Sequence, residues 1–214
     1  MAMTGFNPEI VNASIKNVQS AYEELMSVLG DQMQRDFVDG MQDKWACKEA
    51  QEFFTNSFKP TIESIIKSST ATFESVVTSM GSAGRAWAED TKTSYNPPAF
   101  SADNKQIDAS VIQENVGGIR GIDKDSAATV AAKLPGLATS AKDALDNAKK
   151  AVQNSGFVGG TQEESLINSL EQIKTKITNV VDEVTEKIEE VVENTISEYG
   201  DTGTRIAEAF TLQG

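Results

Sequence analysis

The second half of this chain repeats the pattern of the first half. A glycine motif, Gly-x-x-Gly-x-x-x-Ala-Glu, begins at Gly81 and again at Gly200, 119 residues further on (200 − 81). An aromatic residue marks a bend upstream of each motif, Trp45 in the first half and Phe157 in the second, 112 residues apart (157 − 45). The offsets differ by 7 residues, about two helical turns, so an inserted heptad keeps the apolar face of a helix in register. The sequence therefore predicts a duplicated unit with a longer last helix.

Each copy of this unit contains two segments with helical periodicity. The first copy opens with Asn7 and Pro8, which suit the N-cap and the first position of a helix. Apolar residues recur at every third or fourth position to about Val38, and again over about Lys48–Asp90, so two helices are expected. Pro60 lies inside the second helix and has no N–H, so we expect a kink there. The predicted core-facing residues are Val11, Ile15, Val18, Tyr22, Leu25, Leu29, Met33 and Phe37, then Phe54, Phe58, Ile62, Ile65, Ile66, Phe73, Val76, Val77, Met80 and Trp87.

The second copy shows the same two-helix pattern. A third helix is expected over about Ser126–Gln153, with a kink or short break at Pro135 and Gly136. Its core-facing residues are rich in alanine, so a neighbouring helix can approach it closely. Thr161 and Glu164 form a capping box before the last helix, whose apolar residues follow coiled-coil spacing. The predicted core-facing residues are Val130, Leu134, Leu137, Ala141, Leu145, Ala148 and Val152, then Leu166, Leu170, Ile173, Ile177, Val180, Val184, Ile188 and Val191.

The segment between the two copies has the composition of a linker. The glycine motif at Gly81 is expected to loosen the end of the second helix, and Pro97 with Pro98 forbids helix just beyond it. Several glycines at 117–121 argue against a continuous helix. Residues 107–125 are therefore expected to form a loop with at most a short helical or extended piece.

These helices predict an all-α fold. One hairpin of this size cannot cover the apolar stripes of both its helices. We therefore expect two tandem antiparallel helical hairpins packed as a four-helix bundle, in which the second hairpin replaces a dimer partner. The expected divisions are a first hairpin at 1–93, a linker and irregular segment at 94–125, and a second hairpin at 126–214.

The composition argues against an enzyme. The chain has 214 residues, a net charge of −13, no histidine and one cysteine. Without histidine it lacks the usual general base near neutral pH and the commonest transition-metal ligand. An acidic chain has no basic surface to neutralise phosphates, so nucleic acid and anionic membranes are poor partners. We expect no catalytic residue, no cofactor and no metal. Cys47 is expected to act as a small apolar residue on a helix, and Asp123-Lys124-Asp125 to cap a helix rather than bind calcium.

The two bends resemble the Trp-x-Gly bend of the WXG superfamily, the small helical substrates of type VII (ESX) secretion. Trp45-Ala46-Cys47 keeps the tryptophan and lacks the glycine, whereas Phe157-Val158-Gly159 keeps the glycine and has phenylalanine for tryptophan. The resemblance implies that Trp45 and Phe157 pack between helices and that Gly159 permits the tight turn. A tandem fusion is similar to the dimers of that family, with the partner built into the same chain.

The same resemblance implies secretion from a bacterium without a cleaved signal peptide. The N-terminus has no positive n-region or apolar run, and no stretch approaches the ~18 apolar residues of a membrane span. Family members often carry a Tyr-x-x-x-Asp/Glu export signal after the second helix. Here Tyr95 and Tyr199 lie near the expected place, but the fourth residue on is Ala99 or Gly203. The export motif is therefore incomplete in both halves.

The sequence predicts a non-enzymatic protein that acts through protein–protein interaction, as a type VII substrate or accessory partner. Its partners would be the secretion machinery or a co-secreted protein, and it would be a monomer with an internal pseudo-dimer or a homo-oligomer. The alternative is a cytoplasmic or surface structural scaffold, such as a phage or chemosensory helical bundle. A lipid carrier that opens its bundle is a third alternative. Stable higher oligomers would favour the scaffold.

Overall fold

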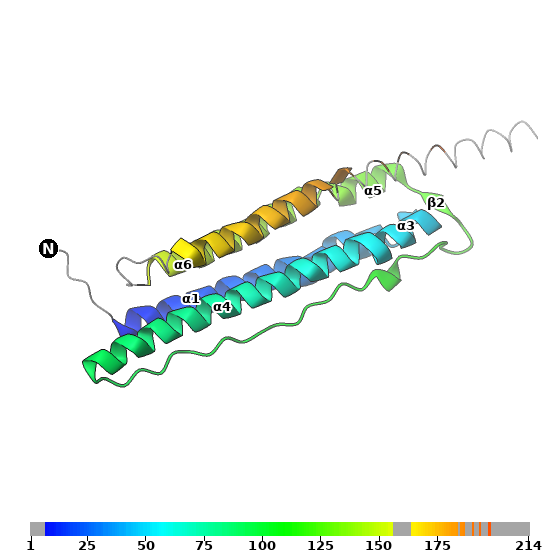
Figure 1. Ribbon diagram of the computed structural model, residues 1–214. Coiled ribbons are helices and arrows are strands. Elements are labelled where there is room, and N and C mark those ends of the chain that lie inside the picture. The colour runs from blue at the N-terminus through cyan, green and yellow to red at the C-terminus, as the bar shows by residue number, and fades with distance from the viewer. Residues whose placement is uncertain are drawn as a thin grey trace, which may run out of the picture.

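The computed structural model describes residues 7–155 and 164–183, and the single positions 185, 186, 190, 193 and 197. These residues are mostly helical, which confirms the predicted all-α class. Long helices lie side by side, and an extended segment follows one face of them (Figure 1). Within the described residues, strand structure is confined to one two-stranded pair and an isolated bridge.

The first predicted helix forms one long helical rod. α1 (Pro8–Met26) starts where the sequence predicts, because Asn7 Oδ1 accepts hydrogen bonds from the N–H groups of Glu9 (3.0 Å) and Ile10 (3.3 Å). The rod continues through the π-helical η1 (Ser27–Val38) into the short α2 (Asp39–Met41). Every predicted core-facing residue of this helix is buried, so the period of the sequence correctly located its inner face.

The second predicted helix continues past its proline, as expected. It comprises α3 (Lys48–Phe53), the π-helical η2 (Phe54–Phe58) and α4 (Lys59–Thr91). The wide turn lies directly before Pro60, where the N–H of Lys59 bonds to the carbonyl of Phe54, five residues earlier. A proline ring clashes with the carbonyl four residues before it, and a wider turn makes room for the ring. All predicted core-facing residues are buried except Trp87, which is 39% exposed.

The third predicted helix is divided where the sequence indicated. α5 (Lys124–Ala131) ends just before α6 (Leu134–Gln153), and Pro135 occupies one of the first two positions of α6. A proline is tolerated there because the first-turn N–H groups have no partner within the helix. All predicted core-facing residues of both pieces are buried. α6 packs against α1, and its alanines 138, 141, 144, 148 and 151 are at most 5% exposed.

The last helix is described over residues 164–183 and lies beside α6 (Figure 1). Two ion pairs join it to α6, Lys149 Nζ to Glu171 Oε1 and Lys174 Nζ to Asp146 Oδ1, both at 2.7 Å. Its predicted residues Leu170, Ile173 and Ile177 are buried, and Leu166 and Val180 are partly buried. The predictions for Val184, Ile188 and Val191, the capping threonine Thr161 and the Gly200 motif lie outside the described residues.

The segment between the two halves is only partly irregular. It contains the short 3-10 turn η3 (Ala109–Val111) and the strand β2 (Gly121–Ile122), as expected of a loop with short helical and extended pieces. β2 pairs antiparallel with β1 (Trp45–Ala46) at the first bend. Just before β2, Val116 and Ile119 form an isolated bridge that closes a turn. The two glycines of this turn, 117 and 118, have φ of +61° and +82°. Positive φ at both positions explains the Gly-Gly pair.

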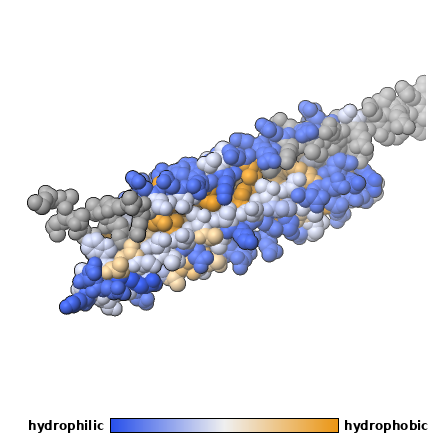
Figure 2. All heavy atoms as spheres, in the orientation of Figure 1, coloured by the Kyte–Doolittle hydropathy of each residue, from blue (hydrophilic) through white to orange (hydrophobic). Residues whose placement is uncertain are grey.

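One hydrophobic core contains residues from both predicted hairpins. Its buried members come from the helices of the first half and from Trp45 at its bend, from α5, α6 and the 164–183 helix, and from Ile107, Ala109 and Ile112 of the connecting segment. Hydrophilic residues cover most of the visible face, and apolar residues show between α4 and the helices of the second half (Figure 2). The two halves therefore do not have separate cores within the described part of the chain.

Candidate functional site

The structure places Trp45 at the first bend, fully buried. Its ring stacks on Phe53 with centroids 6.1 Å apart and meets the ring of Phe54 edge-on at 6.2 Å. Trp45 pairs with Ile122 in the β1–β2 ladder, and the N–H of Asp123 extends the ladder by a 2.7 Å bond to the carbonyl of Lys44. The bend therefore contacts α3, η2 and the connecting segment at β2. Phe157 and Gly159, its predicted counterparts, lie outside the described residues.

Cys47 occupies the position that glycine has in the Trp-x-Gly pattern. It is the N-cap of α3 in extended conformation (φ −157°, ψ 170°), which any residue adopts, so this bend does not require a glycine. Its Sγ accepts a 3.5 Å hydrogen bond from the N–H of Ala50. The residue is buried, as expected for a small apolar side chain, but it caps the helix rather than lying within it.

Residues 94–112, called the strap below, run along the first hairpin and are extended up to the 3-10 turn η3 (Figure 1). Gln19 of α1 binds the backbone of Ser101 on both sides, donating to its carbonyl (2.8 Å) and accepting from its N–H (3.1 Å). Gln34 of η1 binds Asp108 in the same way, at 3.1 and 2.8 Å. Each glutamine amide thus bonds to both the N–H and the carbonyl of one strap residue, as a residue of a neighbouring antiparallel strand would.

Tyr22 makes the third contact of this kind. Its hydroxyl accepts from the N–H of Asp103 (2.9 Å), donates to the carbonyl of the same residue (3.1 Å), and lies 3.1 Å from Thr70 Oγ1. Its ring meets Phe100 of the strap edge-on, with centroids 4.8 Å apart. Tyr22 therefore links the strap, α1 and α4 through one buried side chain.

Tyr22→Phe is expected to lower the free energy of unfolding by about 1–2 kcal/mol, because the N–H of Asp103 loses its partner and its carbonyl keeps only the bond from the N–H of Lys105, while the ring packing remains. Urea denaturation gives the energy, and amide hydrogen exchange at Asp103 is expected to rise. Thr70→Val is the control, since it removes the hydroxyl-to-hydroxyl contact and the Thr70 bond to the carbonyl of Ile66 but leaves both Tyr22 bonds to the backbone of Asp103. Unchanged exchange at Asp103 in Tyr22→Phe would contradict the role given to the hydroxyl.

The glycine motif at Gly81 makes room for side chains of the strap on the surface of α4. α4 passes through Gly81 and Gly84 without interruption, so the expected loosening of its last turns is wrong. A Cβ on Gly81 would lie 3.1 Å from the Pro97 side chain, and one on Gly84 would overlap the ring of Tyr95. Both glycines thus have a local packing reason that does not depend on a repeat.

A third glycine seats the only lysine of the strap. A Cβ on Gly30 would lie 2.5 Å from Lys105 Cβ, so the lysine stem rests directly on the η1 backbone. Its ammonium is 2.9 Å from Asp31 Oδ2 and 3.3 Å from Asp103 Oδ2. The hydrogen bond to Asp31 raises the pKa of Lys105 above its usual value. The strap is therefore matched to its seat in both shape and charge.

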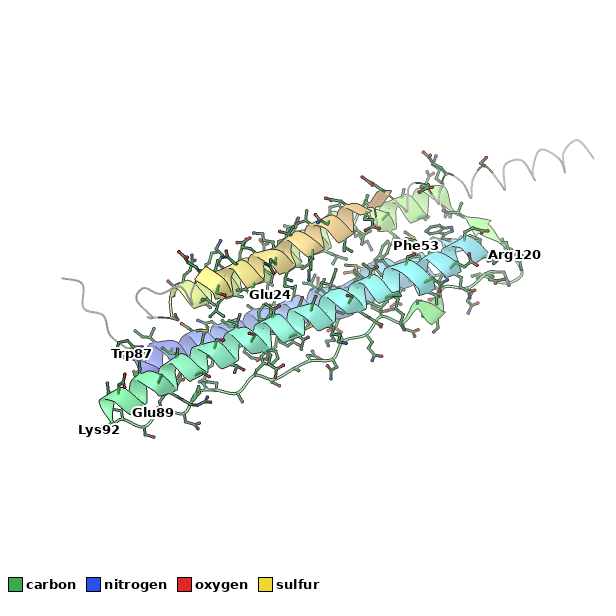
Figure 3. The ribbon with its side chains drawn as sticks, viewed as in Figure 1. Glu24, Phe53, Trp87, Glu89, Lys92 and Arg120 are labelled. Carbon is green, nitrogen blue, oxygen red and sulfur yellow. The ribbon has the colours of Figure 1, made fainter. Side chains whose placement is uncertain are left out.

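Large apolar side chains are exposed at the two ends of the first hairpin. Ile10 (44%) and Trp87 (39%) belong to the end where α1 begins and α4 finishes, and Val116 (40%) and Ile119 (75%) flank the Gly-Gly turn. Figure 3 shows Trp87 beside the Lys92 end, with Arg120 at the opposite end. A shallow groove also lies between α4 and the start of the 164–183 helix, lined mainly by small side chains. These are the candidate surfaces for a protein partner.

The described residues contain no group of three or more metal-ligating side chains. Their carboxylates all lie at partly or fully exposed positions. Asp123 caps α5, accepting from Ser126 N–H (3.2 Å) and Oγ (2.7 Å), and these bonds lower its pKa. Hydrogen bonds from Ser110 likewise lower the pKa of Asp108. The shifts have ordinary capping causes. No described helix is long and apolar enough to cross a membrane.

Comparison of the chain with protein-family models, with curated proteins and with solved structures finds no match. No function can therefore be transferred from a relative. The resemblance to the WXG superfamily rests on the bend residues alone.

Proposed function

We propose that this chain is a non-enzymatic helical protein similar to type VII (ESX/WXG) secretion substrates or their accessory partners, acting through protein–protein contacts. The observation that supports this most is the burial of Trp45 at the bend of a helical hairpin, against Phe53 and Phe54. A bend aromatic that packs between two helices is the role implied by the resemblance. In this proposal Phe157 and Gly159 form the second bend, and export uses no cleaved signal peptide.

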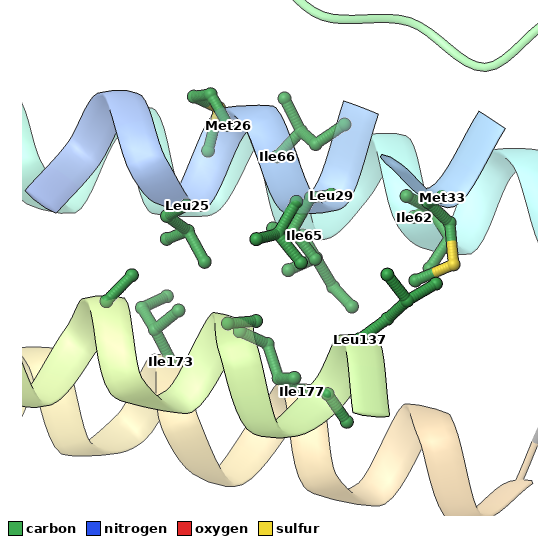
Figure 4. Packing of buried hydrophobic residues seen from close by; sticks show 14 of the residues in the cluster. Leu25, Met26, Leu29, Met33, Ile62, Ile65, Ile66, Leu137, Ile173 and Ile177 are labelled. Carbon is green, nitrogen blue, oxygen red and sulfur yellow. The ribbon is translucent and has the colours of Figure 1, made fainter. Parts of the chain in front are cut away.

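The same proposal includes a four-helix bundle made of two antiparallel hairpins. Close packing of α6 on α1, and the two ion pairs between α6 and the 164–183 helix, support it. Leu25 and Leu29 of the first rod face Leu137 and Ile173 of the second half across a shared core (Figure 4). The second hairpin would then cover the face that a separate subunit covers in a dimer.

Export is tested by comparing culture supernatants of strains with and without the ATPase of the secretion system. The protein is expected in the supernatant of the intact strain and only in the cell pellet of the strain without the ATPase. A cytoplasmic enzyme serves as the marker for lysis. Equal retention in the pellet of both strains would sink the export proposal.

A structural scaffold is the second candidate function. The exposed apolar residues at the two ends, Trp87 at one and Ile119 at the other, favour it, because end-to-end contacts would bury them. Analytical ultracentrifugation separates the two proposals. Concentration-dependent filaments or higher oligomers support the scaffold. A particle that stays a monomer or a dimer at high concentration supports the secretion substrate.

A further inference from the structure

The C-terminal end of α4 has a lysine, Lys92, in a backbone conformation that is unfavourable for residues other than glycine. Its N–H groups follow the Schellman pattern, with Thr93 N bonded to Ala88 O (2.9 Å) and Lys92 N to Glu89 O (3.2 Å). Lys92 stands where glycine is usual and has φ +52°, ψ +36°. Among the described residues it is the one non-glycine with positive φ. A side chain in the left-handed region is disfavoured because its Cβ crowds the following carbonyl.

This turn is also the covalent connection between two parts that pack on each other. The strap lies on α1 and η1, β2 pairs with β1, and α6 packs on α1. The strap, β2 and α6 all follow Lys92 in the chain and pack on segments that precede it. If the turn opened, residues from 93 onward could reach the first hairpin of another molecule and remake each of these contacts.

The seat of the strap is matched to the strap itself. The hydrogen bonds from Gln19, Tyr22 and Gln34 go to backbone atoms and would accept many extended peptides. The glycine seats are more selective, because Gly30 fits the stem of Lys105 and Asp31 binds its ammonium. The strap of a second copy of this chain would satisfy both the backbone hydrogen bonds and the contacts of Lys105.

We propose that the strap groove, the surface of α1, η1 and α4 on which residues 94–112 lie, is an interface with a second copy of this chain. It forms when Lys92 straightens and two molecules exchange residues 93 onward. The closed monomer and the exchanged dimer share all the contacts above and differ at the two hinges. The exchanged form relieves the left-handed conformation of Lys92 in both chains. The inference does not depend on the export proposal, because it concerns the purified protein.

Hinge variants give effects of opposite sign. Lys92→Gly is expected to weaken dimerisation by at least about tenfold, since glycine adopts the closed turn freely. Lys92→Pro fixes φ near −65° and is expected to shift the protein to the dimer. Lys124→Pro is the matched control, because residue 124 is the first of α5, where proline is tolerated. Each full chain is incubated near its unfolding temperature, cooled, and analysed by size-exclusion chromatography with light scattering.

Charge reversal shows whether the dimer is the exchanged one. Asp31→Lys and Lys105→Glu each place like charges at the strap seat of a monomer. Mixed together, they restore both opposite-charge pairs only if the strap of one chain lies in the groove of the other. At low salt, differently tagged chains are expected to form the mixed dimer several-fold above the statistical proportion. The double variant, in which the pair is restored within one chain, should show no such excess.

Three results would overturn the proposal. One is the absence of dimer from both the unmodified chain and Lys92→Pro when Lys92→Pro remains folded by circular dichroism. Another is a dimer equally abundant in Lys92→Gly and Lys92→Pro. The third is a statistical mixture in the charge-reversal experiment, which would assign dimerisation to another surface, such as the exposed ends. Secretion can succeed or fail in any of these cases, so the two proposals fail separately.

Discussion

Trp45→Ala is expected to lower the free energy of unfolding by about 3–5 kcal/mol, the usual cost of truncating a large buried aromatic. Trp45 is 0% exposed, and its ring contacts Phe53 and Phe54. Its backbone also holds the β1–β2 pair, so the cavity would form where the first hairpin and the connecting segment meet. Urea denaturation followed by circular dichroism at 222 nm measures the loss.

The control for this experiment is the other tryptophan of the chain. Trp87 is 39% exposed at the opposite end of the hairpin, so Trp87→Ala is expected to cost less than about 1 kcal/mol. Trp45→Phe should lie between the two alanine variants, because it keeps an aromatic ring at the bend, as Phe157 does in the proposed second bend. Equal losses in the two alanine variants would show that Trp45 has no special role at the bend.

The helices were predictable because their apolar residues recur with the period of an α-helix. Every third or fourth position from Val11 to Phe37 is buried, and so are the predicted positions of α6. Irregularities were predictable where a backbone donor is missing, since the helix widens before Pro60 and divides before Pro135. The π-helical form of the turn before Pro60 was not predicted, because apolar residues spaced three and four apart indicate an ordinary α-helix.

The strap was expected only as a linker, and the reason lies in how it is bound. Gln19 and Gln34 bind backbone atoms, so their partners at Ser101 and Asp108 carry no recognisable side-chain pattern. Both glutamines also lie on faces that a periodicity analysis assigns to solvent. A usable signal was present in the strap itself, where Phe100, Ile107 and Ile112 are apolar residues in a segment too irregular for a helix.

The glycine motif shows how a correct pattern can have a local cause. The sequence linked Gly81 to Gly200 as evidence for a duplication. In the structure, Gly81 and Gly84 admit Pro97 and Tyr95 of the strap. Residues 200–208 lie outside the described part of the chain, so the duplication stays a prediction.

Ala144→Leu is expected to lower the free energy of unfolding by about 3 kcal/mol, at the upper end of the range for overpacked cores. Ala144 is 0% exposed and belongs to the alanine-rich face of α6, the helix that packs on α1. Because Ala144 is fully buried, a leucine there is expected to push neighbouring segments apart or to leave its preferred rotamer. Ala13→Leu, on the exposed face of α1, is the control and should change stability by less than about 0.5 kcal/mol.

Because the alanine-rich face of α6 joins the two halves, Ala144→Leu should also raise amide exchange in α6 more than in α4. Stability equal to that of Ala13→Leu would mean that α6 does not pack closely on α1 in solution, and the proposed pseudo-dimer would then lose its main support.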